Sequence, residues 1–367
     1  MRILHMANHV NESGNGIVNV MVDLACAQAA LGCEVAVASG GGGYEALLAR
    51  QGVRHYRLDQ RRSPLALARA AIRFGRIADE FAPDFVHAHM VTGALLARFA
   101  RGFRRFKLVT HVHNRFQRSS DWMKIGDAVI AVSRAVADDM ARRGVEASRL
   151  RVVRNGTIGS PRTAGDDRLP LHGRAIVTVA GMYERKGIAE LLDAFDRLAA
   201  RHPDAVLHLV GDGPDRARFE ERAAQSPYRD RIRFEGFRTD GGRWMRAADV
   251  FVLASHTDSF PLVLVEAREA GCAIVATAVD GIPEALDNGE AGVLVPPRDA
   301  AALAAAIDRL LSDEGWRQAH RSRAAQGLDY YRVGRMAEET IRIYEELRTP
   351  APAAPTIAAR GRSERTL

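Results

Sequence analysis

The sequence has few cysteines and no long hydrophobic run. Only three cysteines, Cys26, Cys33 and Cys272, are scattered over 367 residues, which excludes a disulfide framework and suits a reducing cytoplasm. No window reaches the roughly 18 uninterrupted apolar residues that a membrane-spanning helix needs. The first residues, MRILHMANHV, lack the charged start, the apolar segment and the cleavage site of a signal peptide. We therefore expect a cytoplasmic protein.

Two patterns that commonly hold nucleotides are also absent. The turn SGNGIVNV places Gly14 and Gly16 before a helix, but Asn19 stands where the dinucleotide pattern G-x-G-x-x-G has its third glycine. No Asp-x-Asp pair occurs, which weighs against a nucleotide held through chelated Mg²⁺ or Mn²⁺. What remains is a glycine turn at a helix N-terminus, where free N–H groups and the helix dipole suit a phosphate. A generic turn is the alternative interpretation.

The histidines do not make a metal motif either. PDFVHAHM and THVHN each put two histidines on one face of a strand, His87 with His89 and His111 with His113. No nearby acid or cysteine completes a zinc shell. We therefore expect no metal site.

Acidic residues are scarce in the first half of the chain. Residues 1–165 carry 24 Lys and Arg against 13 Asp and Glu, and the remainder carries 28 against 32. This excess indicates an anionic partner, such as a membrane surface, a phosphorylated lipid or an acidic glycan. A helix predicted over residues 96–106 would set Phe99, Phe103 and Phe106 among arginines at an anionic inner membrane. The alternative is a solvated Arg-rich surface with the phenylalanines in the core. No nucleic-acid-binding motif accompanies the charge.

Short apolar runs alternate with helical patterns along most of the chain. RILHMAN, CEVAVAS and PDFVHAHM are typical of strands, and SPLALARAAIRFGRIADEF is typical of a helix. Such alternation predicts parallel βαβ units with right-handed crossovers. The alternation breaks at TIGSPRTAGDDRLPLHG, a linker-like stretch, and restarts at AIVTVAG. The predicted fold class is α/β, with two Rossmann-like doubly wound domains facing a central cleft, where ligands bind at the carboxyl ends of the strands.

The expected boundaries follow from this alternation. Residues 1–165 form an N-terminal domain, 166–330 a C-terminal domain and 331–348 a last helix. Residues 349–367, rich in Pro, Ala and Arg, are expected to be a disordered tail.

Two further stretches carry candidate site residues. In AGMYERKGIAELL, Gly181 ends a strand and Arg185 and Lys186 open a helix, where two cations would clamp a diphosphate and offset a leaving group's charge. A solvated basic turn is the alternative. In DSFPLVLVE, Asp258 follows a strand and Glu266 lies about two turns into an apolar helix. A helix cap is the alternative for Asp258, and an exposed acid for Glu266. A carboxylate on so apolar a helix needs donors, which sugar hydroxyls would supply.

The motifs in this order resemble those of the retaining GT-B glycosyltransferases of family four, the group one transferases that use nucleotide sugars. The resemblance covers residues 1–348. The motifs that carry it are PDFVHAH, THVHN, DAVIAVS, VVRNG, RKG, VGDGPDRARFE, FEGFR, ADVFVLAS, the spacing of Asp258 and Glu266, VDGIPEAL and GVLVPPRD. It implies a donor held mainly by the C-terminal domain, an acceptor held mainly by the N-terminal one, and a last helix that crosses back.

The resemblance also implies roles for single residues. Backbone N–H of Gly16 would contact the diphosphate, and Lys186 and Arg185 would neutralise it. Glu266 would bind the ribose, and Asp258 and His113 would lie near the transferred sugar. The remaining donor-binding candidates are Gly181, Phe237, Arg238, Ser259, Phe260, Leu262 and Val263.

Three positions depart from the family pattern. Asp258 is one methylene shorter than the usual Glu, which affects its expected sugar contact. Met182 stands where many relatives carry a phosphate-binding Arg. The stretch NGT, which ends at Thr157, lacks the Asp of the usual pattern NG-x-D.

The implied activity is transfer of a hexosyl or N-acetylhexosaminyl unit, with retention and without metal or other cofactor. The donor is a nucleoside-diphosphate sugar, UDP-sugar favoured over GDP-sugar, and the acceptor is a hydroxyl of a glycan or lipid-linked molecule. Bacterial surface polysaccharide synthesis, at capsule, exopolysaccharide or lipopolysaccharide, is the expected setting, with possible peripheral placement at the inner face of the plasma membrane. The alternatives are a GT-B sugar-nucleotide epimerase or glycogen-type synthase, both disfavoured by chain length and motif order, and a degenerate non-catalytic GT-B module.

Overall fold

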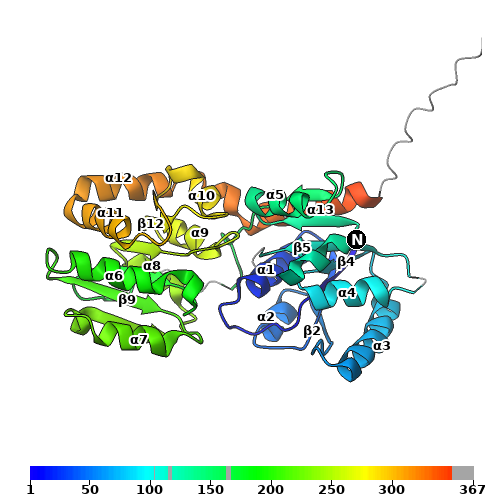
Figure 1. Ribbon diagram of the computed structural model, residues 1–367. Coiled ribbons are helices and arrows are strands. Elements are labelled where there is room, and N and C mark those ends of the chain that lie inside the picture. The colour runs from blue at the N-terminus through cyan, green and yellow to red at the C-terminus, as the bar shows by residue number, and fades with distance from the viewer. Residues whose placement is uncertain (103, 115–117, 163–166, 349–367) are drawn as a thin grey trace, which may run out of the picture.

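The computed structural model describes residues 1–102, 104–114, 118–162 and 167–348, which form two α/β domains side by side (Figure 1). Each domain is built on one parallel sheet, so the predicted fold class is confirmed. The expected boundary between residues 165 and 166 lies outside the described residues, as does the expected tail, 349–367. No helix among the described residues is long and apolar enough to cross a membrane.

The first sheet has seven strands in the order β3-β2-β1-β4-β5-β6-β7. Its strands are β1 (Arg2–Met6), β2 (Glu34–Ser39), β3 (Arg54–Arg57), β4 (Phe85–Ala88), β5 (Lys107–Val112), β6 (Ala128–Ala131) and β7 (Leu150–Val152). Its helices are α1 (Gly16–Ala30), α2 (Glu45–Arg50), α3 (Pro64–Phe81), α4 (Val91–Phe99), η1 (Arg118–Ile125) and α5 (Arg134–Arg142). The strand order reverses between β1 and β4, which opens a crevice at their carboxyl ends.

The second sheet has six strands in the order β10-β9-β8-β11-β12-β13. Its strands are β8 (Arg174–Val179), β9 (Ala205–Val210), β10 (Ile232–Gly236), β11 (Val250–Leu253), β12 (Ala273–Thr277) and β13 (Val293–Val295). Its helices are η2 (Glu184–Lys186), α6 (Ile188–Leu198), α7 (Arg216–Ala224), η3 (Arg229–Arg231), α8 (Gly241–Ala247), α9 (Leu262–Glu269), α10 (Ile282–Ala285), η4 (Asp287–Gly289), α11 (Ala300–Ser312) and α12 (Glu314–Ala324). Here the order reverses between β8 and β11.

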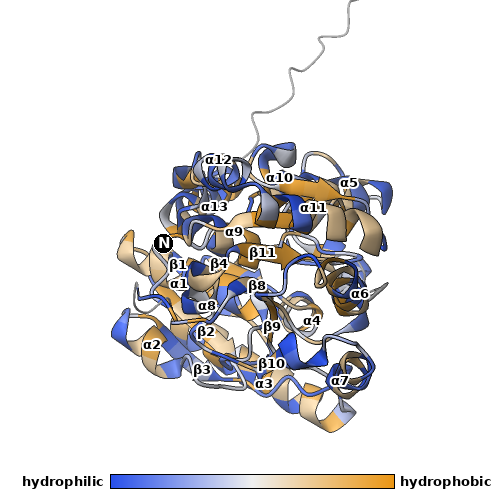
Figure 2. Ribbon diagram, turned by 90° about the vertical axis from the view of Figure 1, so that its left-hand side faces the viewer, coloured by the Kyte–Doolittle hydropathy of each residue, from blue (hydrophilic) through white to orange (hydrophobic). Residues whose placement is uncertain are grey.

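Burial and capping explain these elements. Parallel strands covered by helices on both faces must be apolar throughout, and β4, β6, β11 and β12 are buried at every position. Figure 2 shows hydrophobic residues gathered on the strands around β11, whereas α7 at the edge is largely hydrophilic. Side-chain caps fix several helix starts, as at α3, where the Ser63 hydroxyl accepts the N–H of Ala66.

The helix predicted over residues 96–106 is wrong beyond Phe99. The chain leaves α4 at Ala100, and Gly102 takes a left-handed conformation (φ 57°) that ends the helical path. Phe106 is buried and meets the Phe74 ring edge-on at 6.0 Å, just before β5. Because Phe106 is buried in the core just before β5, the helical spacing of the phenylalanines does not correspond to a helix beyond Phe99. Phe103, the third phenylalanine of that prediction, lies outside the described residues.

The last helices join the two domains. After η5 (Leu328–Tyr331), α13 (Val333–Arg348) runs along the N-terminal domain and packs on α1 (Figure 1). The Tyr344 ring stacks on Phe85 of β4 at 4.6 Å. Where the chain passes between domains, the N–H groups of Thr157 and Ile158 donate to the carbonyl of Tyr331. Helix α13 is thus part of the N-terminal domain's core.

Candidate active site

The glycine turn before α1 faces the C-terminal domain. Gly14 has φ 66°, a conformation that favours glycine, and a Cβ there would lie 3.3 Å from the Phe237 ring. A Cβ on Gly16 would lie 3.9 Å from Leu262 at the start of α9. The Asn15 side chain caps α1 by accepting the N–H of Ile17. The start of α1 therefore meets two of the predicted donor-binding residues across the domain boundary.

Lys186 and Asp258 form an ion pair. Lys186 ends η2 after β8, and Asp258 follows β11; these strands are neighbours in the sheet. Lys186 Nζ lies 2.5 Å from Asp258 Oδ2, with both side chains mostly buried. The next residue, Gly187, has φ 67°, and a Cβ there would lie 1.9 Å from the carbonyl oxygen of Ala254. The glycine of RKG is therefore required for η2 to approach the end of β11.

Arg185 lies beside this pair. Its guanidinium stands over the Tyr183 ring, 5.3 Å from the centroid, and its carbonyl accepts the N–H of His256. Gly181 precedes both, and a Cβ there would meet the Tyr183 ring at 2.8 Å. Met182 is fully buried, and its side chain packs in the core of the C-terminal domain.

Asp280 holds the loop that carries Asp258. Its carboxylate accepts the N–H of Asp258 at 3.0 Å and the hydroxyl of Thr257. The N–H of Gly281 donates back to the Asp258 carbonyl at 3.0 Å. A Cβ on Gly281 would lie 1.9 Å from the Ser259 carbonyl oxygen, so only glycine fits. The sequence marked this VDGIPEAL stretch as a motif but gave Asp280 no role.

Glu266 lies half-buried on α9, about one turn from the helix start at Leu262 and not the two turns expected from the sequence. Burial raises the pKa of its carboxyl, and the charge of Arg162 opposes that rise. Arg162 comes from the interdomain segment and forms a two-point ion pair with buried Asp23 of α1, at 2.8 and 2.7 Å. Sequence reasoning treated Arg162 as linker and missed it.

The other donor-binding candidates surround α9 and β10. Ser259, Phe260 and Leu262 are buried and Val263 is half-buried; Pro261 is the N-cap of α9 instead of a helical residue. Phe237 is exposed, next to the Gly14 turn. Arg238 donates to the Glu235 carbonyl and lies over Trp244.

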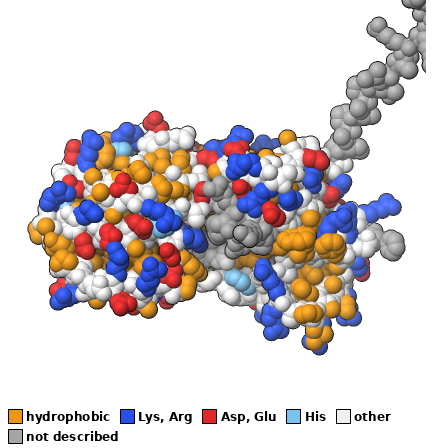
Figure 3. All heavy atoms as spheres, viewed as in Figure 1, with side chains coloured by type: hydrophobic (Ala, Val, Ile, Leu, Met, Phe, Trp, Pro, Cys, Tyr) orange, Lys and Arg blue, Asp and Glu red, His pale blue; other side chains and the backbone are white. Residues whose placement is uncertain are grey.

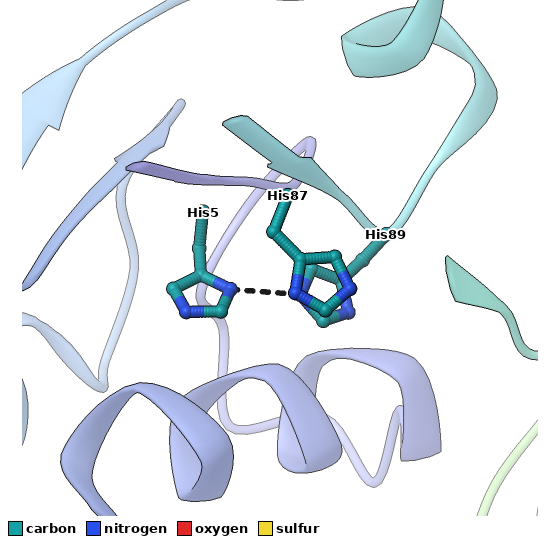
Figure 4. A group of neighbouring side chains, drawn as sticks. All are labelled: His5, His87 and His89. Carbon is teal, nitrogen blue, oxygen red and sulfur yellow. Dashed lines mark hydrogen bonds between the residues drawn. The ribbon is translucent and has the colours of Figure 1, made fainter. Parts of the chain in front are cut away.

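His113, which is half-buried, belongs to a cluster of five histidine rings at the ends of β1, β4 and β5, and the other four rings are buried. His5 was not singled out from the sequence, because a lone histidine on a strand carries no pattern. Figure 4 shows the rings of His5, His87 and His89 close together above α1. The rings of His111 and His113 continue the stack, with their centroids 4.2 Å apart. Burial lowers the pKa of His113 to about 3 and of His5 to about 4.

Two sets of three in this cluster bring ring nitrogens within 4.8 Å of one another: His5 with His87 and His89, and His89 with His111 and His113. Among the described residues, neither set includes a carboxylate or thiolate. A buried divalent ion there would lack any neutralising anion. Next to His113 lies a pocket of about 260 Å³ that Asn8, Asn15 and Arg62 also line.

Comparison with known proteins gives the family. The family described as Glycosyl transferases group 1 matches residues 173–313, and Glycosyltransferase Family 4 matches residues 14–157. A phosphatidyl-myo-inositol mannosyltransferase of Mycobacterium leprae is 30% identical over 285 residues, which cover 72% of this chain and 74% of that protein. The chain belongs to the group 1 glycosyltransferases of family 4. A glycogen synthase of Mycobacterium tuberculosis is 29% identical over 323 residues, 80% of this chain and 77% of that one.

The fold of this family 4 enzyme matches a solved relative closely. The structure of Anabaena Alr3699/HepE in complex with UDP-glucose superposes with a TM-score of 0.81 at 20% identity, over 94% of this chain and all of that one. The expected GT-B fold and glycosyltransferase family are confirmed. Chain length does not disfavour a glycogen-type synthase, contrary to our expectation, because a relative of that name aligns over most of both chains. The roles of single site residues stay predictions.

Proposed function

We propose that this enzyme transfers a hexosyl or N-acetylhexosaminyl unit, with retention, from a nucleoside-diphosphate sugar to a hydroxyl of a glycan or lipid-linked acceptor. The observation that carries the proposal is the ion pair between Lys186 and Asp258, which lies in the loop before α9, together with the approach of Leu262 at the start of α9 to the glycine turn before α1. Cations and helix N-termini at one point suit a diphosphate. Glu266, about one turn along α9, then accepts hydrogen bonds from the ribose hydroxyls.

The transfer itself needs few protein groups. The bond between the sugar C1 and the diphosphate oxygen breaks, and the acceptor oxygen bonds to C1 on the same face. The acceptor's proton goes to an oxygen of the leaving phosphate. Lys186 leaves Asp258 for the diphosphate and, with Arg185, stabilises its growing negative charge. Asp258, Gly181, His113 and the turn at Gly16 hold the sugar and diphosphate in place.

UDP-sugar is the favoured donor, because the solved HepE relative binds UDP-glucose. Phe237 and Arg238, with Ser259, Phe260, Leu262 and Val263, form the nucleotide end of the site. Two relatives act on lipid-bearing acceptors by their names, a phosphatidyl-myo-inositol mannosyltransferase and a lipopolysaccharide core glycosyltransferase of Rhizobium meliloti. We therefore place the reaction in bacterial surface polysaccharide or glycolipid synthesis, with no metal required.

A glucan acceptor is the second candidate, favoured by the similarity to glycogen synthase. One experiment tests both. Purified protein is incubated with UDP- and GDP-sugars, and nucleotide release is measured with lipid-linked acceptors, with glycogen and without acceptor. Release that depends on a lipid-linked acceptor supports the first candidate, and release with glycogen supports the second. Conversion of donor without acceptor would indicate an epimerase, and absence of donor binding a non-catalytic module.

We further propose that α3 rests on an anionic membrane. Figure 3 shows hydrophobic side chains gathered over α3 and α4, with basic ones nearby. Leu65, Ile72 and Phe99 are each more than 60% exposed. Exposed Arg69, Arg73 and Arg76 lie along the same helix. Exposed apolar residues among arginines are typical of a helix lying at a lipid surface, and flotation with anionic vesicles tests it.

A further inference from the structure

The buried histidines form a continuous hydrogen-bonded chain from α1 to the pocket. Gln28 Oε1 lies 2.8 Å from His5 Nε2. His5 Nδ1 lies 3.0 Å from His89 Nε2, and His89 Nδ1 lies 3.0 Å from His113 Nε2. Each of the two middle rings therefore uses both of its nitrogens within the chain. Among the described residues, the last ring, His113, has a hydrogen-bond partner at Nε2 alone.

The direction of this chain follows from what each atom can do. A neutral imidazole has one N–H donor and one acceptor nitrogen, and burial keeps these rings neutral. An amide oxygen only accepts, so His5 must carry its proton on Nε2 and accept at Nδ1. His89 must then donate from Nε2 and accept at Nδ1. His113 must in turn donate from Nε2.

The amide of Gln28 is itself oriented from the returning helix. Gln28 Nε2 donates to the hydroxyl of Tyr344 on α13 at 3.4 Å. That hydroxyl also lies 2.5 Å from His87 Nδ1. Reversing the chain would turn the Gln28 amide, so that its oxygen, instead of its N–H, faced Tyr344. In the orientation that the structure shows, the Gln28 amide donates to Tyr344 and its oxygen faces His5, and each ring of the chain then takes one tautomer.

We propose that Gln28, His5 and His89 are positioning residues that hold His113 as the Nε2–H tautomer, with the Nδ1 lone pair available to accept a hydrogen bond from a hydroxyl of the transferred sugar. His113 lines the pocket of about 260 Å³. The sugar contact rests on the proposed function; the tautomer does not. A fixed acceptor distinguishes sugars that present a hydroxyl at this point from those that lack it.

A metal ion in the same cluster is the competing interpretation. An ion held by His89, His111 and His113 would replace the contact between His89 and His113 and would satisfy His111, whose two nitrogens have no hydrogen-bond partner among the described residues. The three consecutive hydrogen bonds and the lack of an anion in either set favour the chain.

The direct test is nuclear magnetic resonance of the full chain labelled with ¹⁵N-histidine. Long-range proton–nitrogen correlations report which nitrogen of each ring is protonated, and His113→Asn identifies the His113 signals. We expect His113 to be protonated at Nε2 only. In Gln28→Met we expect both tautomers of His113, whereas Gln28→Glu, which keeps an acceptor oxygen, retains one. Cys26→Ala, a buried change on the same helix, is the control and leaves His113 unchanged.

Activity supplies the second readout. Gln28→Met should lower kcat/KM roughly two- to tenfold, the value of one hydrogen bond, and Gln28→Glu should restore it. If Gln28→Met does not fold, Tyr344→Phe keeps the ring on Phe85 but releases the amide, and should also mix the tautomers. Protonation of His113 at Nδ1, a tautomer unaffected by Gln28→Met, or stoichiometric Zn²⁺ binding that removes both ring protons would overturn the proposal. An inactive protein in which His113 has the expected tautomer would contradict only the proposed sugar contact and would leave the tautomer assignment standing.

Discussion

Replacing Lys186 by Met separates its two expected roles, in stability and in transfer. The Lys186 and Asp258 side chains are 14% and 13% exposed. Their pair is therefore intermediate between exposed pairs, worth at most about 1 kcal/mol, and fully buried ones, whose breakage costs about 3–5 kcal/mol. We expect Lys186→Met to destabilise the protein by about 2–3 kcal/mol, because Asp258 is left without its cation. The corresponding fall in Tm is roughly 5–10 °C.

Transfer should respond more strongly than stability. Loss of one preorganised group that stabilises transition-state charge typically costs about 10²–10³-fold in kcat, and we expect a loss of that size in nucleotide release. The double variant Lys186→Met with Asp258→Asn removes both charges. We expect it to regain most of the lost Tm and none of the lost activity.

Asp258→Asn alone should strengthen nucleotide binding, whereas Lys186→Met should weaken nucleotide release. Lys186 then has no acid to leave before it meets the diphosphate, so UDP should bind about two- to tenfold more tightly by calorimetry. Full transfer activity in a folded Lys186→Met protein would refute the assignment. A double variant no more stable than Lys186→Met would refute the energetic argument for the pair.

The sequence was sufficient to predict the helices and strands and to identify single site residues. It was not sufficient to predict which residues those side chains contact in the folded protein. Lys186 and Asp258 were each identified from local motifs, and only the adjacency of β8 and β11 pairs them across 72 positions. His5 and Arg162 have no local pattern at all. Their partners lie on α1 and at the ends of other strands, which only the tertiary structure specifies.

The end of α4 shows a different limit. The spacing of the phenylalanines favoured a helix to residue 106. Helical periodicity depends only on the positions of apolar residues and carries no information on where the next strand must begin. Phe106 is instead the entry to β5 and packs on Phe74. Gly102, in a left-handed conformation, was the local signal that could have ended the helix earlier.

Three further predictions test other parts of the site. Gly281→Ala should destabilise the protein by about 2 kcal/mol or more and abolish donor binding, because the Cβ would overlap the Ser259 carbonyl; a thermal scan and UDP titration check this, and wild-type values would contradict it. UDP affinity should weaken as pH falls from neutral toward the raised pKa of Glu266, because the protonated carboxyl no longer accepts from both ribose hydroxyls; Glu266→Gln, measured by calorimetry, should remove that dependence. Ile72→Glu should abolish flotation with anionic vesicles while nucleotide release with a soluble acceptor persists, and unchanged flotation would exclude α3 as the contact.

The segment VDGIPEAL links the donor loop to the other domain. Asp280 holds the Asp258 loop, and four residues later Glu284 accepts the N–H of Ala135 at the start of α5 at 3.1 Å and the guanidinium of Arg154 at 2.9 Å. One short helix therefore contacts both the candidate sugar site and the N-terminal domain. A movement between the domains that broke the Glu284 contacts would act on the turn at Gly281 and, through it, on Asp258. Asp280 and Glu284 thus connect the loop that carries Asp258 with the N-terminal domain.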